Sequence, residues 1–85
     1  MKTKEMHCVG GFTYHVDAVQ EADNRFRGQI YFVGREDTGE EITPPVIVPT
    51  RVAFKKESAA LIEADAYSLE LIKSGAILDL INQTA

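Results

Sequence analysis

The spacing of hydrophobic residues changes once along this chain, and that change limits the folds open to it. In residues 12–20 and 25–35 apolar side chains recur at every second position, which is typical of strands with one buried face. From about Lys56 to Ser74 they recur at three- and four-residue spacing, which is typical of an amphipathic helix. A chain of 85 residues has room for one hydrophobic core. We therefore expect a single α+β domain over residues 1–85.

The first two strands are predicted to pair as a hairpin whose register follows from its loop. A three-residue loop, residues 22–24, places Val16 opposite Ile30 and keeps the apolar residues on one face. A two-residue loop would instead place apolar residues opposite polar ones. In the preferred register Asn24 takes a left-handed conformation, which asparagine tolerates better than most residues.

A third strand is expected around Glu41 to Val48, after a turn at residues 36–39. Pro44, Pro45 and Pro49 cannot donate hydrogen bonds to a neighbouring strand. This strand is therefore predicted to lie at the edge of the sheet, next to the second strand, and to be broken in the middle.

The helix is predicted to cover one face of the sheet and to end at Gly75. Gly28 and Gly34 fall on the apolar side of the second strand, where they indicate bulges or a close approach by whatever packs there. The tail, residues 76–85, begins too apolar to be free in water and is expected to form a short second helix. The fold class is thus a three-stranded antiparallel meander packed on one long C-terminal helix, with a short apolar tail. The predicted buried face of the helix consists of Ala60, Leu61, Ala64, Tyr67, Leu71 and Ile72.

Composition excludes several classes of protein. The single cysteine, Cys8, rules out an internal disulfide, which fits a reducing cytoplasm. No apolar run is long enough for a membrane span, and none follows the first lysines as a secretory signal requires, so we expect neither feature. The net charge of −4 opposes binding to nucleic acid or to an anionic membrane through charge alone.

Residues that could carry catalysis or bind a metal are few. His7, Cys8 and His15 are too few and too poorly spaced for a zinc site, and no group is identified that would orient a cysteine–histidine pair. The pair at residues 10–11, Gly-Gly, lacks the pattern of a phosphate-binding loop and indicates a turn or bulge. We therefore predict no catalytic residue, no metal site and no cofactor, and expect that the protein is not an enzyme.

The outer face of the sheet is one candidate binding surface. In the preferred register Arg25, Arg27, Tyr31 and Arg35 share the face turned away from the helix. Arginines beside an exposed aromatic ring are typical of surfaces that bind single-stranded nucleic acid or an anionic ligand. The alternative is a solvated face with cross-strand ion pairs, which the acidic composition favours.

The back of the helix is a second candidate surface. Ile62, Ala66 and Leu69 project away from the predicted core face. Either the tail folds over them or another subunit does, and the second alternative predicts a homodimer. Our leading hypothesis is a non-enzymatic protein-interaction or structural module. It would act through the back of the helix, the proline-rich edge strand or the outer face of the sheet, and nucleic-acid binding is its rival.

The segment Val52–Glu57, the alanine pair at 59–60, the pair Leu71-Ile72 and the stop at Gly75 carry a resemblance to known proteins. The chain resembles small bacterial proteins of unknown function in which strand hairpins precede one helix. That resemblance implies the fold and no activity. The order of three strands and a helix also resembles the latter part of a double-stranded RNA-binding domain.

Overall fold

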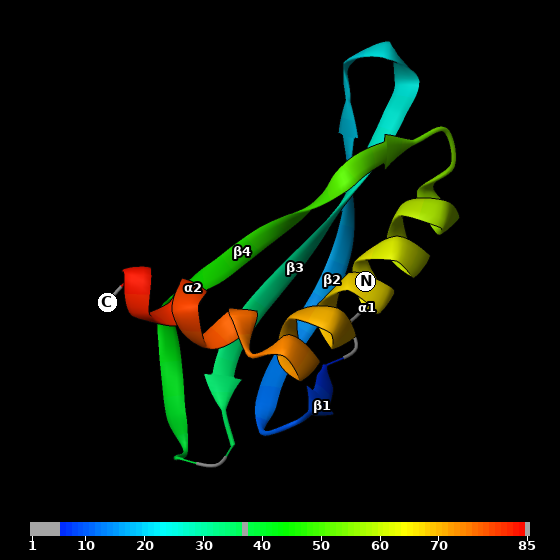
Figure 1. Cartoon of the computed structure of the whole chain (residues 1–85). Helices are drawn as coiled ribbons and strands as arrows, with labels where there is room; N and C mark the ends of the chain where they lie inside the picture. Colours follow the sequence, from blue (N-terminus) through cyan, green and yellow to red (C-terminus); the bar gives the residue numbers. More distant parts are fainter. Residues whose placement is uncertain (1–5, 37, 85) are drawn as a thin grey trace.

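The fold has two layers, an antiparallel sheet and two helices that lie on the same face of it (Figure 1). The computed structural model describes residues 6–36 and 38–84, so most of the segment used to exclude a secretory signal lies outside it. Within these ranges the sheet has four strands in the order β1-β2-β3-β4. The α+β class is confirmed, with one strand more than the predicted three and with a second helix, formed by the tail, beside the predicted long one. The elements are β1 His7–Val9, β2 Phe12–Glu21, a 3-10 turn at Ala22–Asn24, β3 Arg25–Arg35, β4 Glu40–Phe54, α1 Glu57–Ser74 and α2 Ala76–Thr84.

The strand that was not predicted, β1, is joined to β2 by a pair of glycines. Gly10 and Gly11 have φ values of 59° and 84°, and a two-residue hairpin loop of this kind requires positive φ at both positions. Val9 consequently lies opposite Phe12. Three residues are too few to show a two-residue period, so the glycine pair is the sequence signal for β1.

The hairpin of β2 and β3 confirms the predicted register. Val16 lies opposite Ile30. The connection has the predicted three residues, and Asn24 is left-handed with φ of 54°. Asp23 is left-handed as well, with φ of 67°, which a short polar side chain tolerates. The tip of this hairpin extends past the helices (Figure 1).

The edge strand, β4, lies where it was predicted but is longer and unbroken. It runs over Glu40–Phe54 instead of ending near Val48. Pro44 and Pro45 fall where β4 shifts register against β3, because residues 42–45 face a single β3 residue there. Prolines cannot donate hydrogen bonds to the neighbouring strand, and a bulge of this kind accommodates them while the strand continues. The predicted break is therefore wrong.

The helix α1 approaches β3 closely because Gly28 has no side chain. A Cβ atom at this position would lie 2.5 Å from the carbonyl oxygen of Ala60 and 2.8 Å from Cβ of Ala64. The Gly28 N–H falls at another register shift and donates to Oγ1 of Thr50 over 3.2 Å. The prediction that Gly28 marks a close approach is therefore confirmed.

The core lies between the sheet and the two helices. On α1 the buried residues include Ala60, Ala64 and Leu71, whereas Leu61, Tyr67 and Ile72 from the predicted face are only half-buried. Ser68 is fully buried and was not predicted; its hydroxyl donates to the carbonyl oxygen of Asp65 over 2.6 Å, which satisfies the polar group. The buried hydrophobic residues are Phe12, Tyr14, Ile30, Phe32, Val46, Val48, Ala60, Ala64, Leu71 and Ile77.

The C-terminal tail forms the second helix, as predicted. Gly75 ends α1 in a left-handed conformation with φ of 80°, and its N–H donates to the carbonyl oxygen of Ile72 over 3.2 Å. The chain then turns into α2, whose Ile77 is fully buried in the core. The tail therefore completes the helical layer over the sheet.

Candidate functional site

An apolar strip runs along the outer face of α1. It consists of Ile62, Ala66 and Leu69 and is called the α1 strip below. Ile62 is 71% exposed and Leu69 is 41% exposed, and Ala66 between them is exposed as well. Because α2 packs into the core through Ile77 and leaves both side chains exposed, the alternative in which the tail covers the strip is wrong.

Carboxylates flank the α1 strip on both sides. Glu63 and Glu70 lie on the flank nearer β4, and Asp65 lies on the other flank. Glu70 accepts a hydrogen bond from Arg51 of β4 over 2.9 Å in an exposed ion pair. The Arg51 guanidinium also lies over the ring of Tyr67, at 4.6 Å from its centroid. The sequence did not reveal this link between β4 and α1.

A pocket of about 390 Å³ lies beside this flank, between β4 and the first half of α1. It is lined by Arg51, Val52, Phe54 and Glu63. Val52 is 58% exposed, so the wall of this pocket is partly apolar.

The outer face of the sheet carries a stacked pair of rings at its centre. The rings of His15 and Tyr31 lie 4.6 Å apart at an angle of 18°. The hydroxyl of Tyr31 donates to Oε1 of Gln29 over 2.6 Å, and Ile47 lies opposite Tyr31 on β4. One face of Tyr31 is therefore already covered by the histidine.

Arg27, the central arginine predicted on this face, is engaged within the fold. Its Nε donates to a carboxylate oxygen of Glu21 over 3.0 Å, and its Nη1 donates to the carbonyl oxygen of Thr50 over 2.6 Å. Arg25 is exposed next to the hairpin loop, opposite Glu21. The local arrangement therefore matches the alternative of cross-strand ion pairs.

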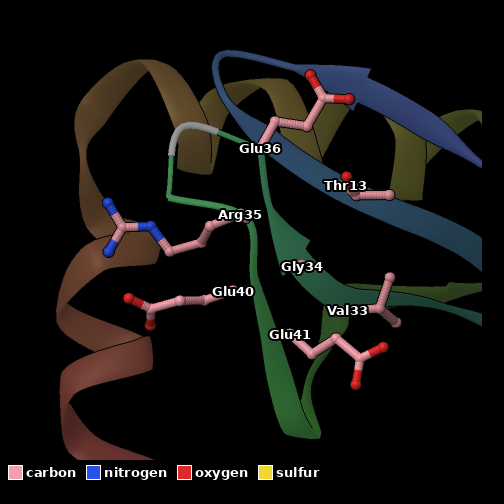
Figure 2. Close-up of a pocket in the computed structure, with 8 residues that line it drawn as sticks. Thr13, Val33, Gly34, Arg35, Glu36, Glu40 and Glu41 are labelled. Carbon is pink, nitrogen blue, oxygen red and sulfur yellow. The ribbon is translucent and has the colours of Figure 1, made fainter.

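Arg35 does not share that face, so the prediction of one surface with Arg27 and Tyr31 is wrong for this residue. It lies opposite the buried Phe12, and its guanidinium carbon is 5.7 Å from the centroid of that ring. Figure 2 shows the Arg35 side chain pointing towards the helices, whereas Val33 points to the other side of the sheet. Register shifts in both neighbouring strand pairs turn the side chain over.

The same shifts open a shallow acidic hollow of about 470 Å³ at this end of the sheet (Figure 2). Glu36 and Glu41 line the hollow, and Gly34 has no side chain that could fill it. This also confirms the bulge predicted at Gly34. Within residues 6–36 and 38–84 no group of three or more His, Cys, Asp or Glu side chains is arranged to hold a metal ion.

Cys8 is exposed beside this hollow. Its thiol hydrogen-bonds to the Glu36 carboxylate, which raises the pKa of Cys8, and partial desolvation and the negative charge of Glu36 act in the same direction. A hydrogen bond with Thr13 opposes them. The two histidines near it in sequence stack on tyrosines, His7 on Tyr14 and His15 on the outer face. The raised pKa disfavours the thiolate form of Cys8 and thus a nucleophilic role.

No described helix combines the length and the apolar content that crossing a bilayer requires. Comparisons with protein-family models, with curated proteins and with solved structures gave no significant match. The resemblance to small bacterial hairpin-and-helix proteins therefore stays a prediction. The α1 strip and its acidic flanks are the features from which a function can be argued.

Proposed function

We propose that this chain is a non-enzymatic protein-interaction module and that the α1 strip is its contact surface. The observation that carries the proposal is the exposure of Ile62, at 71%, in line with Leu69 on a helix that is otherwise packed on the sheet. Single exposed apolar residues are common, but apolar residues aligned on one face are typical of interaction sites.

The state of Cys8 supports the non-enzymatic part of the proposal. A catalytic cysteine acts as its thiolate and is usually placed near a positive group that lowers its pKa. The neighbour of Cys8 is instead the Glu36 carboxylate, and the pKa is raised. The chemistry around the thiol is therefore opposite to that of an activated nucleophile.

The engagement of the arginines supports a protein partner over nucleic acid. The guanidinium of Arg27 is bound to Glu21 and to a backbone carbonyl, and Arg35 lies on the helix side of the sheet. A phosphate backbone on the outer face would thus meet fewer cations than the sequence suggested. The net charge of −4 acts against it as well.

A homodimer is the form of the proposal that needs no other protein. Two copies would then bury their α1 strips against each other, and light scattering over a range of concentrations would give twice the mass of the chain. The proposal holds equally for a complex with another protein, and the test below separates the two.

Site-specific photo-cross-linking tests the proposal. A benzoylphenylalanine residue is placed at Ala66, in the centre of the strip, and in a control variant at Asp23, in the exposed hairpin loop. We expect a cross-linked product from position 66 alone, identified by mass spectrometry as a second copy or as another protein. The double variant Ile62→Ser and Leu69→Ser should abolish it. The absence of a product specific to position 66 would contradict the proposal.

A further inference from the structure

The charges beside the α1 strip indicate what kind of partner fits it. At about 100° per residue, Glu63 and Glu70 lie roughly 70 to 90° to one side of the strip, and Asp65 lies roughly 70° to the other. All three side chains are exposed. The apolar surface therefore has one carboxylate on one flank, at its centre, and two on the other.

A second copy of the chain fits this surface poorly. If two α1 helices pack antiparallel about a twofold axis, the same flank of each copy lies on the same side of the pair. The Glu63 flank of one copy then faces the Glu63 flank of the other, and the two Asp65 flanks face each other. A twofold axis parallel to the helices would place the Glu63 flank of one copy opposite the Asp65 flank of the other. Both arrangements bring like charges together, which opposes association and selects against that partner.

The cations near the strip do not remove this mismatch. Arg51 pairs with Glu70, and Lys73 lies one turn beyond Leu69 at the end of the helix. Neither cation lies on the Asp65 flank. On the opposite flank Glu63 is exposed and lines the neighbouring pocket. The centre of the strip thus keeps its acidic borders.

We infer that the α1 strip binds a basic amphipathic helix of another protein, an inference that rests on the proposed function. The partner's apolar face packs on Ile62, Ala66 and Leu69, and its lysines or arginines lie against the flanking carboxylates. In paired helices an apolar seam commonly provides the packing, and charged residues beside the seam determine which partner binds.

A model peptide provides the test. The probe is a fluorescently labelled helix of three heptads with leucine at the seam positions and lysine beside them, and the matched control carries glutamate in place of each lysine. Binding to the full chain is followed by fluorescence anisotropy at low and high salt. We expect the lysine peptide to bind at least tenfold more tightly than the glutamate peptide, and to bind less tightly as salt rises.

Variants of the chain separate this site from general attraction to an acidic protein. Ile62→Ser with Leu69→Ser should weaken the lysine peptide at least tenfold, and Glu63→Gln with Asp65→Asn should weaken it severalfold and flatten the salt dependence. Glu41→Gln, which removes a carboxylate on the far side of the sheet, should leave binding unchanged. Equal binding of both peptides, or equal losses in Glu41→Gln and in the strip variants, would overturn the inference.

The cross-linking experiment distinguishes the failure of this inference from the failure of the proposed function. If position 66 cross-links to a second copy and no peptide binds, the strip is an interaction surface whose occupant is the chain itself. If position 66 gives no specific product, the proposed function fails and the inference fails with it.

Discussion

Replacing Gly28 with alanine tests whether the close contact of α1 with β3 holds the two layers together. The added Cβ would lie 2.5 Å from the carbonyl oxygen of Ala60, 2.8 Å from Cβ of Ala64 and 2.9 Å from Cγ2 of Thr50. The nearest of these atoms belongs to the backbone of α1, so the methyl group cannot be accommodated by a side-chain rotation. The helix, the strand or both must move apart.

Overpacking of this kind costs about 1 to 3 kcal/mol, and contacts with both α1 and β4 place Gly28→Ala in the upper half of that range. A domain of this size has a net stability of about 3 to 5 kcal/mol. Since 1 kcal/mol shifts the melting temperature of such a domain by about 4 to 8 °C, we expect Tm to fall by about 10 to 20 °C. Thermal unfolding followed by far-UV circular dichroism measures the change, and urea unfolding checks it.

The control is the same substitution at Gly34 in the same strand. A Cβ there would lie 3.5 Å from its nearest neighbour, the carbonyl oxygen of Glu40, which is an ordinary contact. Neither glycine has positive φ, so alanine causes no backbone strain at either position. Gly34→Ala should change stability by less than about 1 kcal/mol in either direction. Equal melting temperatures for the two variants would refute the packing argument.

Two further predictions concern single polar contacts. Thr50→Val removes a hydroxyl that accepts from the buried Gly28 N–H and donates to the Val52 carbonyl over 2.9 Å. The free energy of unfolding, measured by urea titration, should therefore fall by about 1 to 3 kcal/mol. An unchanged urea midpoint would contradict this. Glu36→Gln replaces the carboxylate that raises the pKa of Cys8, first through its hydrogen bond with the thiol and then through its charge. A larger fraction of the thiol should then ionise at pH 8, and alkylation by iodoacetamide should be faster than in the parent chain; an equal or slower rate would show that Glu36 does not control the thiol.

Local patterns in the sequence were sufficient for the parts of the fold that depend on neighbours along the chain. The register of β2 and β3 followed from alternation and from the conformation of Asn24, and α1 was expected at residues 56–74 and found at Glu57–Ser74. The three-residue strand β1 is too short to show alternation, and its signal in the sequence is the glycine pair that follows it. The length of β4 was underestimated because its prolines were read as a break, while a bulge absorbs two of them.

The candidate surfaces also divide into features that depend on neighbours along the chain and features that depend on the folded sheet. The α1 strip could be found from the sequence because positions i, i+4 and i+7 share one face of a helix. The side of the sheet to which Arg35 points could not, since it depends on register shifts in two strand pairs. The bond from Arg27 to the Thr50 carbonyl joins residues 23 positions apart and needs the folded sheet. Burial of Ser68 was missed because a polar residue is expected in water unless its hydrogen bonds are known.

The prolines of β4 have a consequence for how the protein behaves when it is crowded. An edge strand of 15 residues with an uninterrupted row of N–H groups could recruit the edge of another molecule, and such a contact can repeat without closing until a fibre forms. Pro44, Pro45 and Pro49 remove donors from this strand. Open-ended growth along the sheet is thereby discouraged at the β4 edge. Under the proposed function, recognition falls to the helical layer, where one partner would fill one surface and the assembly would stop.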